Sequence, residues 1–263
     1  MKQRHRLLLR SIVAILFLVV CVTCVWAQEG PVKKANVRPS TELSVRELIT
    51  RGQARNFDRK FNEAIEDFSQ ALKIEPKNGL AFLGLGIANA ELHNTSEAIS
   101  NFDRSVKLDP KNPVSRLARS MLRSELKDHR GALADLDAAI AMDPYYFSAY
   151  SDRALVKLYL NDYEGAIKDC DLVISATSDT RAAHVTRAVA YQRLGKNAEA
   201  LADYEKAIEM DPNDGLPYKN RGCIKQIEGD LSGALADYKK AIEHEPDNRI
   251  LKNAIASLSA KVN

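Results

Sequence analysis

Arginine and aspartate recur along this chain in two rows whose members stand sixteen residues apart. The five pairs are Arg51 with Asp67, Arg119 with Asp135, Arg153 with Asp169, Arg187 with Asp203, and Arg221 with Asp237. At the one place where Leu85 interrupts the arginine row, the aspartate row has Asn101. A buried guanidinium without a carboxylate is costly, so the joint loss of both charges indicates that the two rows are in contact. We predict five partly buried structural ion pairs; an arginine row that binds an anionic ligand is the alternative.

Other residue patterns that carry out chemistry are absent from the sequence. The histidines do not stand at metal-ligand spacing on one helix, and no Cys-x-x-Cys motif follows residue 27. The chain also lacks a glycine-rich phosphate loop and the Gly-x-Ser-x-Gly turn of serine hydrolases. Acidic residues are plentiful, but they lie in repeating rows, which is typical of solvated faces and turns. We therefore expect no catalytic residues, no metal site and no cofactor, and we do not expect an enzyme.

The basic surplus of the chain lies at its N-terminus. The formal net charge is +3, but Lys2, Arg4, Arg6 and Arg10 occur in the first 27 residues without any acidic residue. The rest of the chain is close to neutral and has no basic cluster of the kind that marks a nucleic-acid interface. We expect no nucleic-acid partner.

The same N-terminal segment has the layout of a secretory signal peptide. An uncharged stretch from Ser11 to Ala27 follows the basic residues and ends in Val-Trp-Ala, and a polar segment comes next. We predict a cleaved signal peptide at residues 1–27 and a polar linker at 28–44, with a membrane anchor as the alternative for 1–27. In both cases the rest of the chain is exported through the cytoplasmic membrane, and only an uncleaved segment would contact a membrane.

A 34-residue repeat positions the two charged rows. A small residue, an alanine, a bulky residue, a second small residue and a proline recur at this period from Val45 to Asn248. The alanine row comprises Ala64, Ala98, Ala132, Ala166, Ala200 and Ala234, and the bulky row comprises Phe68, Phe102, Leu136, Cys170, Tyr204 and Tyr238. Residues spaced by three and four lie on one helix face, and proline ends a helix. The pattern predicts two antiparallel helices per repeat, which must stack on their neighbours.

Six such repeats are expected, at residues 45–78, 79–112, 113–146, 147–180, 181–214 and 215–248. Ser44 and Glu47 have the spacing of a capping box, which begins the first helix. Residues 249–263 start a seventh first-helix pattern and then stop, so we expect a capping helix there. In the fourth repeat Ser178 replaces the proline, and the segment Ile174–Thr180 is the expected place for altered curvature or a hinge.

These rows resemble those of the tetratricopeptide repeat family over residues 45–248. The resemblance implies an all-α fold, a right-handed superhelical solenoid of six helix-turn-helix repeats with a C-terminal capping helix. It also implies a concave groove, lined by the first helices, in which a peptide or helix of a partner protein binds. The implied groove residues are Leu83, Ile87, Leu117, Met121, Leu155, Tyr159, Val185 and Val189. The alternative is that these side chains belong to the core, covered by repeat packing or by the linker.

Taken together, these features favour a non-catalytic scaffold or adaptor of the cell envelope, placed in the periplasm or outside the cell. An apolar groove suits an amphipathic helix or an extended apolar segment of another protein. The second interpretation is a self-assembling repeat module, a homo-oligomer that has no separate peptide ligand.

Overall fold

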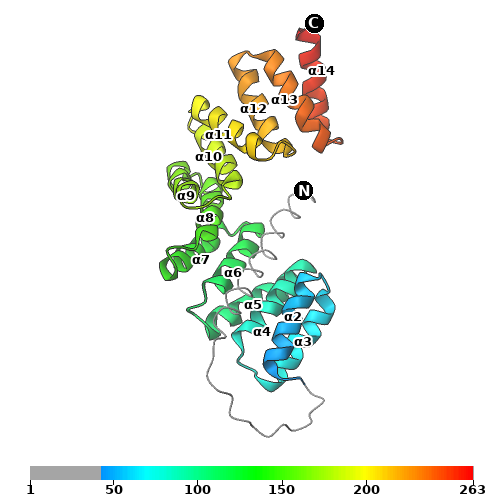
Figure 1. Ribbon diagram of the computed structural model, residues 1–263, viewed down its shortest axis with the longest axis vertical. Coiled ribbons are helices and arrows are strands. Elements are labelled where there is room, and N and C mark those ends of the chain that lie inside the picture. The colour runs from blue at the N-terminus through cyan, green and yellow to red at the C-terminus, as the bar shows by residue number, and fades with distance from the viewer. Residues whose placement is uncertain (1–42, 263) are drawn as a thin grey trace. The chain divides into compact units, whose positions relative to one another are not determined.

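The computed structural model describes residues 43–262, and all regular structure in that range is α-helical (Figure 1). The expected all-α class is therefore confirmed. The signal peptide and nearly all of the linker lie outside the described residues. The helices are α2 (Val45–Phe57), α3 (Phe61–Ile74), α4 (Gly79–Glu91), α5 (Thr95–Leu108), α6 (Pro113–Glu125), α7 (His129–Met142), α8 (Phe147–Tyr159), α9 (Tyr163–Ala176), α10 (Arg181–Arg193), α11 (Asn197–Met210), α12 (Gly215–Glu228), α13 (Leu231–His244) and α14 (Arg249–Val262).

The chain divides into two compact units, and the boundary falls between Met142 and Asp143. The N-terminal unit contains the helix pairs α2–α3, α4–α5 and α6–α7. The C-terminal unit contains the pairs α8–α9, α10–α11 and α12–α13, followed by α14. Within each unit, every helix packs against the helix that precedes it. None of the helices between residues 43 and 262 is long and apolar enough to span a bilayer.

In three helix pairs, a glycine of the first helix faces the ring of a bulky residue on the second. Phe68 and Phe102 are fully buried, and their rings lie against Gly52 and Gly86. A methyl group added at Gly86 would come within 2.5 Å of the Phe102 ring. Because that distance is below any normal carbon–carbon contact, the glycine is what allows the two helices to approach each other.

The turn inside each pair has a left-handed residue at the same place in every repeat. These residues have φ angles from 62° to 89° and are Arg59, His93, Lys127, Asn161, Gly195 and Gly229. Only the last two are glycines, the residue type that adopts this conformation without steric cost. The row repeats every 34 residues, yet its side chains share no chemistry, so the sequence pattern did not indicate it.

Side chains at the helix ends explain where the elements begin and stop. The predicted capping box is confirmed, because the Ser44 hydroxyl accepts a hydrogen bond from the Glu47 amide while Glu47 accepts one from the Ser44 amide. Helix α9 ends at Ala176 without a proline. Thr177 is extended there, and its hydroxyl donates to the Val173 carbonyl at 3.1 Å. Helices α9 and α10 pack closely within one compact unit, whereas the division of the chain lies one repeat earlier than the expected hinge at Ile174–Thr180.

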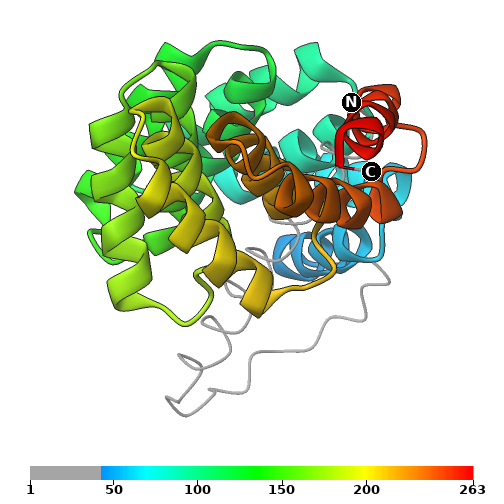
Figure 2. The same cartoon turned by 90° about the horizontal axis from the view of Figure 1, so that it is seen from above.

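The last helix covers the end of the C-terminal unit (Figure 2). Leu251 and Leu258 of α14 are buried and pack with Tyr238 and Ala241 of α13. On its other side, α14 exposes Lys252, Asn253, Ser257 and Lys261. This helix therefore has one apolar face against the last repeat and a mostly polar face toward solvent, apart from Ile250, which is the arrangement that a terminal repeat needs.

Candidate functional site

The structure places all five predicted arginine–aspartate pairs in contact. In each pair, Nε and one Nη of the arginine donate to the two carboxylate oxygens of the aspartate, a geometry that gives a strong, oriented pair. The shortest distances lie between 2.5 Å, for Arg51 and Arg119, and 2.7 Å for the other three. The aspartate side chains are nearly fully buried. Hydrogen bonding to Asp135 also raises the pKa of Arg119 above its ordinary value.

Four of these aspartates also bind a second cation, which the sequence pattern had not indicated. In four repeats this cation stands four residues after the arginine. These contacts are Arg55 to Asp67 and Arg123 to Asp135, both 2.8 Å, Lys157 to Asp169 at 2.8 Å, and Lys225 to Asp237 at 3.0 Å. In the fifth repeat Tyr191 occupies that position, and His184 Nδ1 lies 2.8 Å from Asp203 instead.

The second repeat carries the signal that would have revealed this larger network. It has Leu85 in the arginine row, Asn89 in the second cation row and Asn101 in the aspartate row, so all three charges are missing together. Asn89 donates to the Leu85 carbonyl instead of pairing with a carboxylate. The unit that varies together is therefore a triad of one aspartate and two cations.

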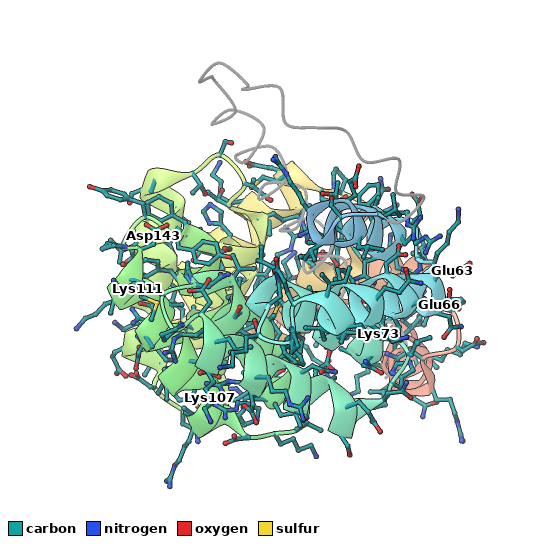
Figure 3. All side chains as sticks on the ribbon, turned by 90° about the horizontal axis from the view of Figure 1, so that it is seen from below. Glu63, Glu66, Lys73, Lys107, Lys111 and Asp143 are labelled. Atoms are coloured by element: carbon teal, nitrogen blue, oxygen red, sulfur yellow. The ribbon has the colours of Figure 1, made fainter. Side chains whose placement is uncertain are left out.

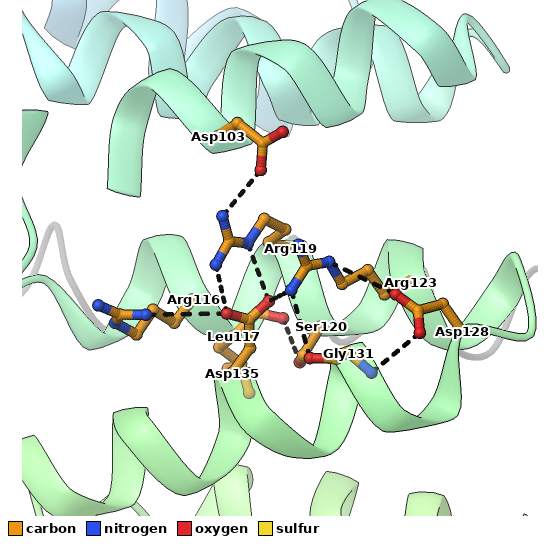
Figure 4. Close-up of polar contacts among 9 residues, drawn as sticks. All are labelled: Asp103, Arg116, Leu117, Arg119, Ser120, Arg123, Asp128, Gly131 and Asp135. Atoms are coloured by element: carbon orange, nitrogen blue, oxygen red, sulfur yellow. Dashed lines mark hydrogen bonds and ion pairs between the residues drawn. The ribbon is translucent and has the colours of Figure 1, made fainter. Parts of the chain in front are cut away.

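Three of the arginines also reach an acidic residue of the preceding repeat. Arg119 Nη1 lies 2.8 Å from Asp103 on α5 while Nη2 contacts Asp135 on α7 (Figure 4). Arg187 makes the same bridge from Asp171 to Asp203, and Arg221 approaches Glu205 at 3.9 Å. The row thus links successive helix pairs within each unit. Because aspartates already occupy these guanidinium groups, the arrangement supports the structural interpretation over an anion-binding row.

Four of the implied groove residues lie in the N-terminal unit, and all four are buried. Leu83, Ile87, Leu117 and Met121 expose 5%, 2%, 1% and 6% of their surface. Leu83, Ile87 and Met121 pack with Phe102 and Leu122 in one apolar cluster. The expected open groove is therefore closed at these positions, and these side chains serve the core of the N-terminal unit.

The other four lie on α8 and α10 of the C-terminal unit and are more accessible. Tyr159 exposes 53% of its surface, and Leu155, Val185 and Val189 are half-buried. Helices α8 and α10 contact each other, so the four residues come from neighbouring first helices. We call these four residues the α8–α10 surface.

Residues 43–262 contain no group of three or more histidine, cysteine, aspartate or glutamate side chains that could hold a metal ion. The two cysteines of this range, Cys170 on α9 and Cys223 on α12, are free thiols.

Comparison with known proteins identifies the repeat. Residues 50–113 and residues 182–214 match the tetratricopeptide repeat family. No curated protein matches the sequence.

Several solved structures share the fold. The chain is similar to the APC/C hetero-tetramer Cut9–Hcn1, with a TM-score of 0.70 and 17% identity over 82% of this chain, and it spans 42% of that chain. A tetratricopeptide repeat protein from Parabacteroides merdae gives a TM-score of 0.62 and 22% identity, covering 84% of this chain and 87% of that one. YrrB, described as a TPR protein with an unusual peptide-binding site, gives 0.58 and 16%, covering 71% and 96%. Residues 50–113 and 182–214 are therefore similar to tetratricopeptide repeats, and the chain as a whole shares the helix-pair fold of these solved structures.

Proposed function

We propose that this chain is a non-catalytic scaffold or adaptor of the cell envelope that binds a peptide or helix of another protein. The tetratricopeptide fold is a scaffold for protein–protein interactions, which supports the general class. The observation that carries the proposal is the α8–α10 surface, in which Tyr159 is 53% exposed and Leu155 half-buried on α8, while Val185 and Val189 are half-buried on the neighbouring helix α10. Such a stripe on two neighbouring helices suits the apolar face of a partner helix. The peptide-binding site of YrrB, a protein with the same fold, supports the same class of ligand.

The placement in the cell envelope is supported by the sequence of residues 1–27. A basic start, an uncharged stretch and a small-residue exit are the features that direct a chain through the cytoplasmic membrane. The partner is accordingly a protein of the periplasm, of the cell surface or of the medium. No catalytic step is assigned to the chain, because the five aspartates of the arginine–aspartate pairs bind cations in a structural network.

The proposal is tested by site-specific photo-crosslinking in the cells that make the protein. A photoreactive phenylalanine analogue replaces Tyr159 in the full chain, and the crosslinked species are identified by mass spectrometry. The matched control carries the same analogue at Tyr145, which is 80% exposed in the loop before α8. We expect a discrete crosslinked partner from position 159 and none from position 145, because only position 159 lies on the α8–α10 surface.

Two outcomes would contradict the proposal. Equal crosslinking from both positions would show that exposure alone governs the reaction. A crosslinked species with twice the mass of this chain would support the self-assembling module instead. That alternative has its own support in Ile250, which is 80% exposed on the terminal helix α14.

A further inference from the structure

A cleft in the N-terminal unit lies outside the α8–α10 surface and does not depend on the function proposed for it. Its volume is about 360 Å³, and it is lined by Pro76, Lys77, Phe82, Arg104, Lys107 and Leu108. Pro76 and Lys77 come from the loop between α3 and α4, Phe82 from α4, and the other three residues from the last turns of α5. The cleft is therefore built at the junction of the first and second repeats.

The cleft has an apolar floor and a basic rim. Phe82 is 8% exposed, and the Arg104 guanidinium lies over its ring at 5.4 Å from the centroid. Pro76 and Leu108 complete the apolar lining. Lys77 and Lys107 are exposed to solvent, and Figure 3 shows Lys107 at the surface of this unit. A ligand that fills the cleft would therefore meet an aromatic ring and three positive charges at once.

No carboxylate within residues 43–262 forms an ion pair with Lys77, Arg104 or Lys107. The acidic residue of the loop, Glu75, instead accepts a hydrogen bond from Asn78 at 2.9 Å. The unpaired state of these cations contrasts with the arginine row, in which every guanidinium is bound by an aspartate.

In the fifth and sixth repeats, the cation at the position equivalent to Arg104 is neutralised by an acidic residue. There the residue corresponding to Arg104 is a lysine, and a glutamate three residues later pairs with it. The two pairs are Lys206 with Glu209, at 2.7 Å, and Lys240 with Glu243, at 3.2 Å. In the second repeat the glutamate is replaced by Lys107, so two like charges face each other on adjacent turns of α5. Like charges at this spacing repel each other on a helix, so Lys107 does not neutralise Arg104 as the glutamates do in the fifth and sixth repeats.

We propose that this cleft binds an acidic peptide segment of a partner protein, with an aromatic or large apolar side chain on Phe82 and carboxylates on Lys77, Arg104 and Lys107. Charge-assisted hydrogen bonds from arginine and lysine to carboxylates supply the attraction. The apolar floor supplies the preference for a segment with a bulky side chain. A cleft of about 360 Å³ lies near the lower end of ligand-site volumes, so it accepts one or two side chains of a peptide.

The test measures binding of a fluorescein-labelled peptide in which a single phenylalanine is flanked by three aspartate or glutamate residues on each side. Fluorescence anisotropy is recorded with the full chain purified from an export-competent host, at about 0.15 M salt, where charges further than about 8 Å apart are largely screened. We expect Lys107→Glu to weaken binding by about tenfold, or about 1.4 kcal/mol, because it removes one cation and pairs with Arg104. The same substitution should leave the melting temperature equal or higher, since it restores the pairing seen in the fifth and sixth repeats.

The matched control is Lys111→Glu, which makes the same charge change at an exposed lysine on the same unit that does not line the cleft (Figure 3). We expect it to change the affinity less than about twofold, because the remaining effect is screened. Equal losses in the two variants would overturn the proposal in favour of general charge attraction. Equal binding of a peptide with alanine in place of phenylalanine would remove the role of Phe82. Tighter binding of an oligothymidylate, lost in Lys107→Glu, would assign the cleft to nucleic acid instead.

Discussion

In four repeats the buried aspartate of the charged network balances two cations, so the three members of such a triad are not equivalent. Removing Asp135 leaves Arg119 and Arg123 without their shared partner, while removing either arginine leaves the aspartate still paired. The aspartate is also the more deeply buried member, with a side chain 3% exposed against 13% for Arg119 and 25% for Arg123. Breaking a buried pair on one side is expensive because it strands the remaining charge.

We therefore predict that Asp135→Ala lowers the free energy of unfolding by about 3 kcal/mol. The triple variant Arg119→Leu, Arg123→Asn and Asp135→Asn should lose less than half as much, because it copies the neutral residues of the second repeat, Leu85, Asn89 and Asn101. Urea unfolding followed by helical circular dichroism measures both values. Arg130→Ala, at an exposed position on α7, is the control for a simple change of charge. If the triple variant loses as much as Asp135→Ala or more, the triad is not a cooperative unit.

At the scale of the helix, the contact between a small residue and a ring sets how closely the two helices of a repeat approach. Glycine stands opposite the ring in three repeats, as Gly52 to Phe68, Gly86 to Phe102 and Gly222 to Tyr238. In the third repeat the corresponding residues are Ser120 and Leu136, so a larger first-helix residue accompanies a smaller partner. The fifth repeat departs from this rule, because an alanine, Ala188, and not a glycine accompanies the large Tyr204 side chain there.

This packing predicts that Gly86→Ala destabilises the protein, by about 1–3 kcal/mol, because the added methyl group overlaps the Phe102 ring. The sign of this change is informative, because replacing glycine by alanine inside an unhindered helix stabilises the helix by up to about 1 kcal/mol. Combining Gly86→Ala with Phe102→Leu should cost less than the two single changes added together, because the smaller side chain leaves room for the methyl group. Thermal unfolding of the four proteins in this cycle measures the coupling, and additive losses would show that the helices move apart instead.

The helices were predictable from sequence because each is specified by local rows that repeat without insertion. The repeating alanine, aromatic and proline positions predicted the helix pairs, and the spacing of Ser44 and Glu47 predicted the N-terminal cap of the first helix. The accessibility of the groove was not predictable in the same way. Ile87 and Leu155 stand two repeats apart in the same apolar first-helix row, yet Ile87 is 2% exposed and Leu155 is half-buried. Exposure depends on which neighbours pack against a face, and periodicity alone does not contain that information.

At the scale of the whole chain, the division into two compact units could not be predicted, because the 34-residue period is not interrupted at their boundary. The repeat pattern continues through Met142 and Asp143 without insertion, and Pro144 occupies its usual row. The sequence drew attention to Ser178 because a signature residue is missing there, but Thr177 ends helix α9 in place of the proline. The missing proline at Ser178 is thus compensated by its neighbour Thr177. By contrast, no residue of the repeat pattern departs from its row at the boundary between the units.

The proposed export of the protein rests on its N-terminal segment, residues 1–27. Trp26 is the only tryptophan of the chain and precedes the proposed cleavage point after Ala27. We expect protein made in an export-competent host to have the mass of residues 28–263 and to show tyrosine-like emission. Expression in the cytoplasm without export should give the full mass and tryptophan emission, which serves as the control. A membrane-bound species of full mass from the exporting host would establish the anchor instead, because Trp26 would then lie near the membrane interface that its ring favours.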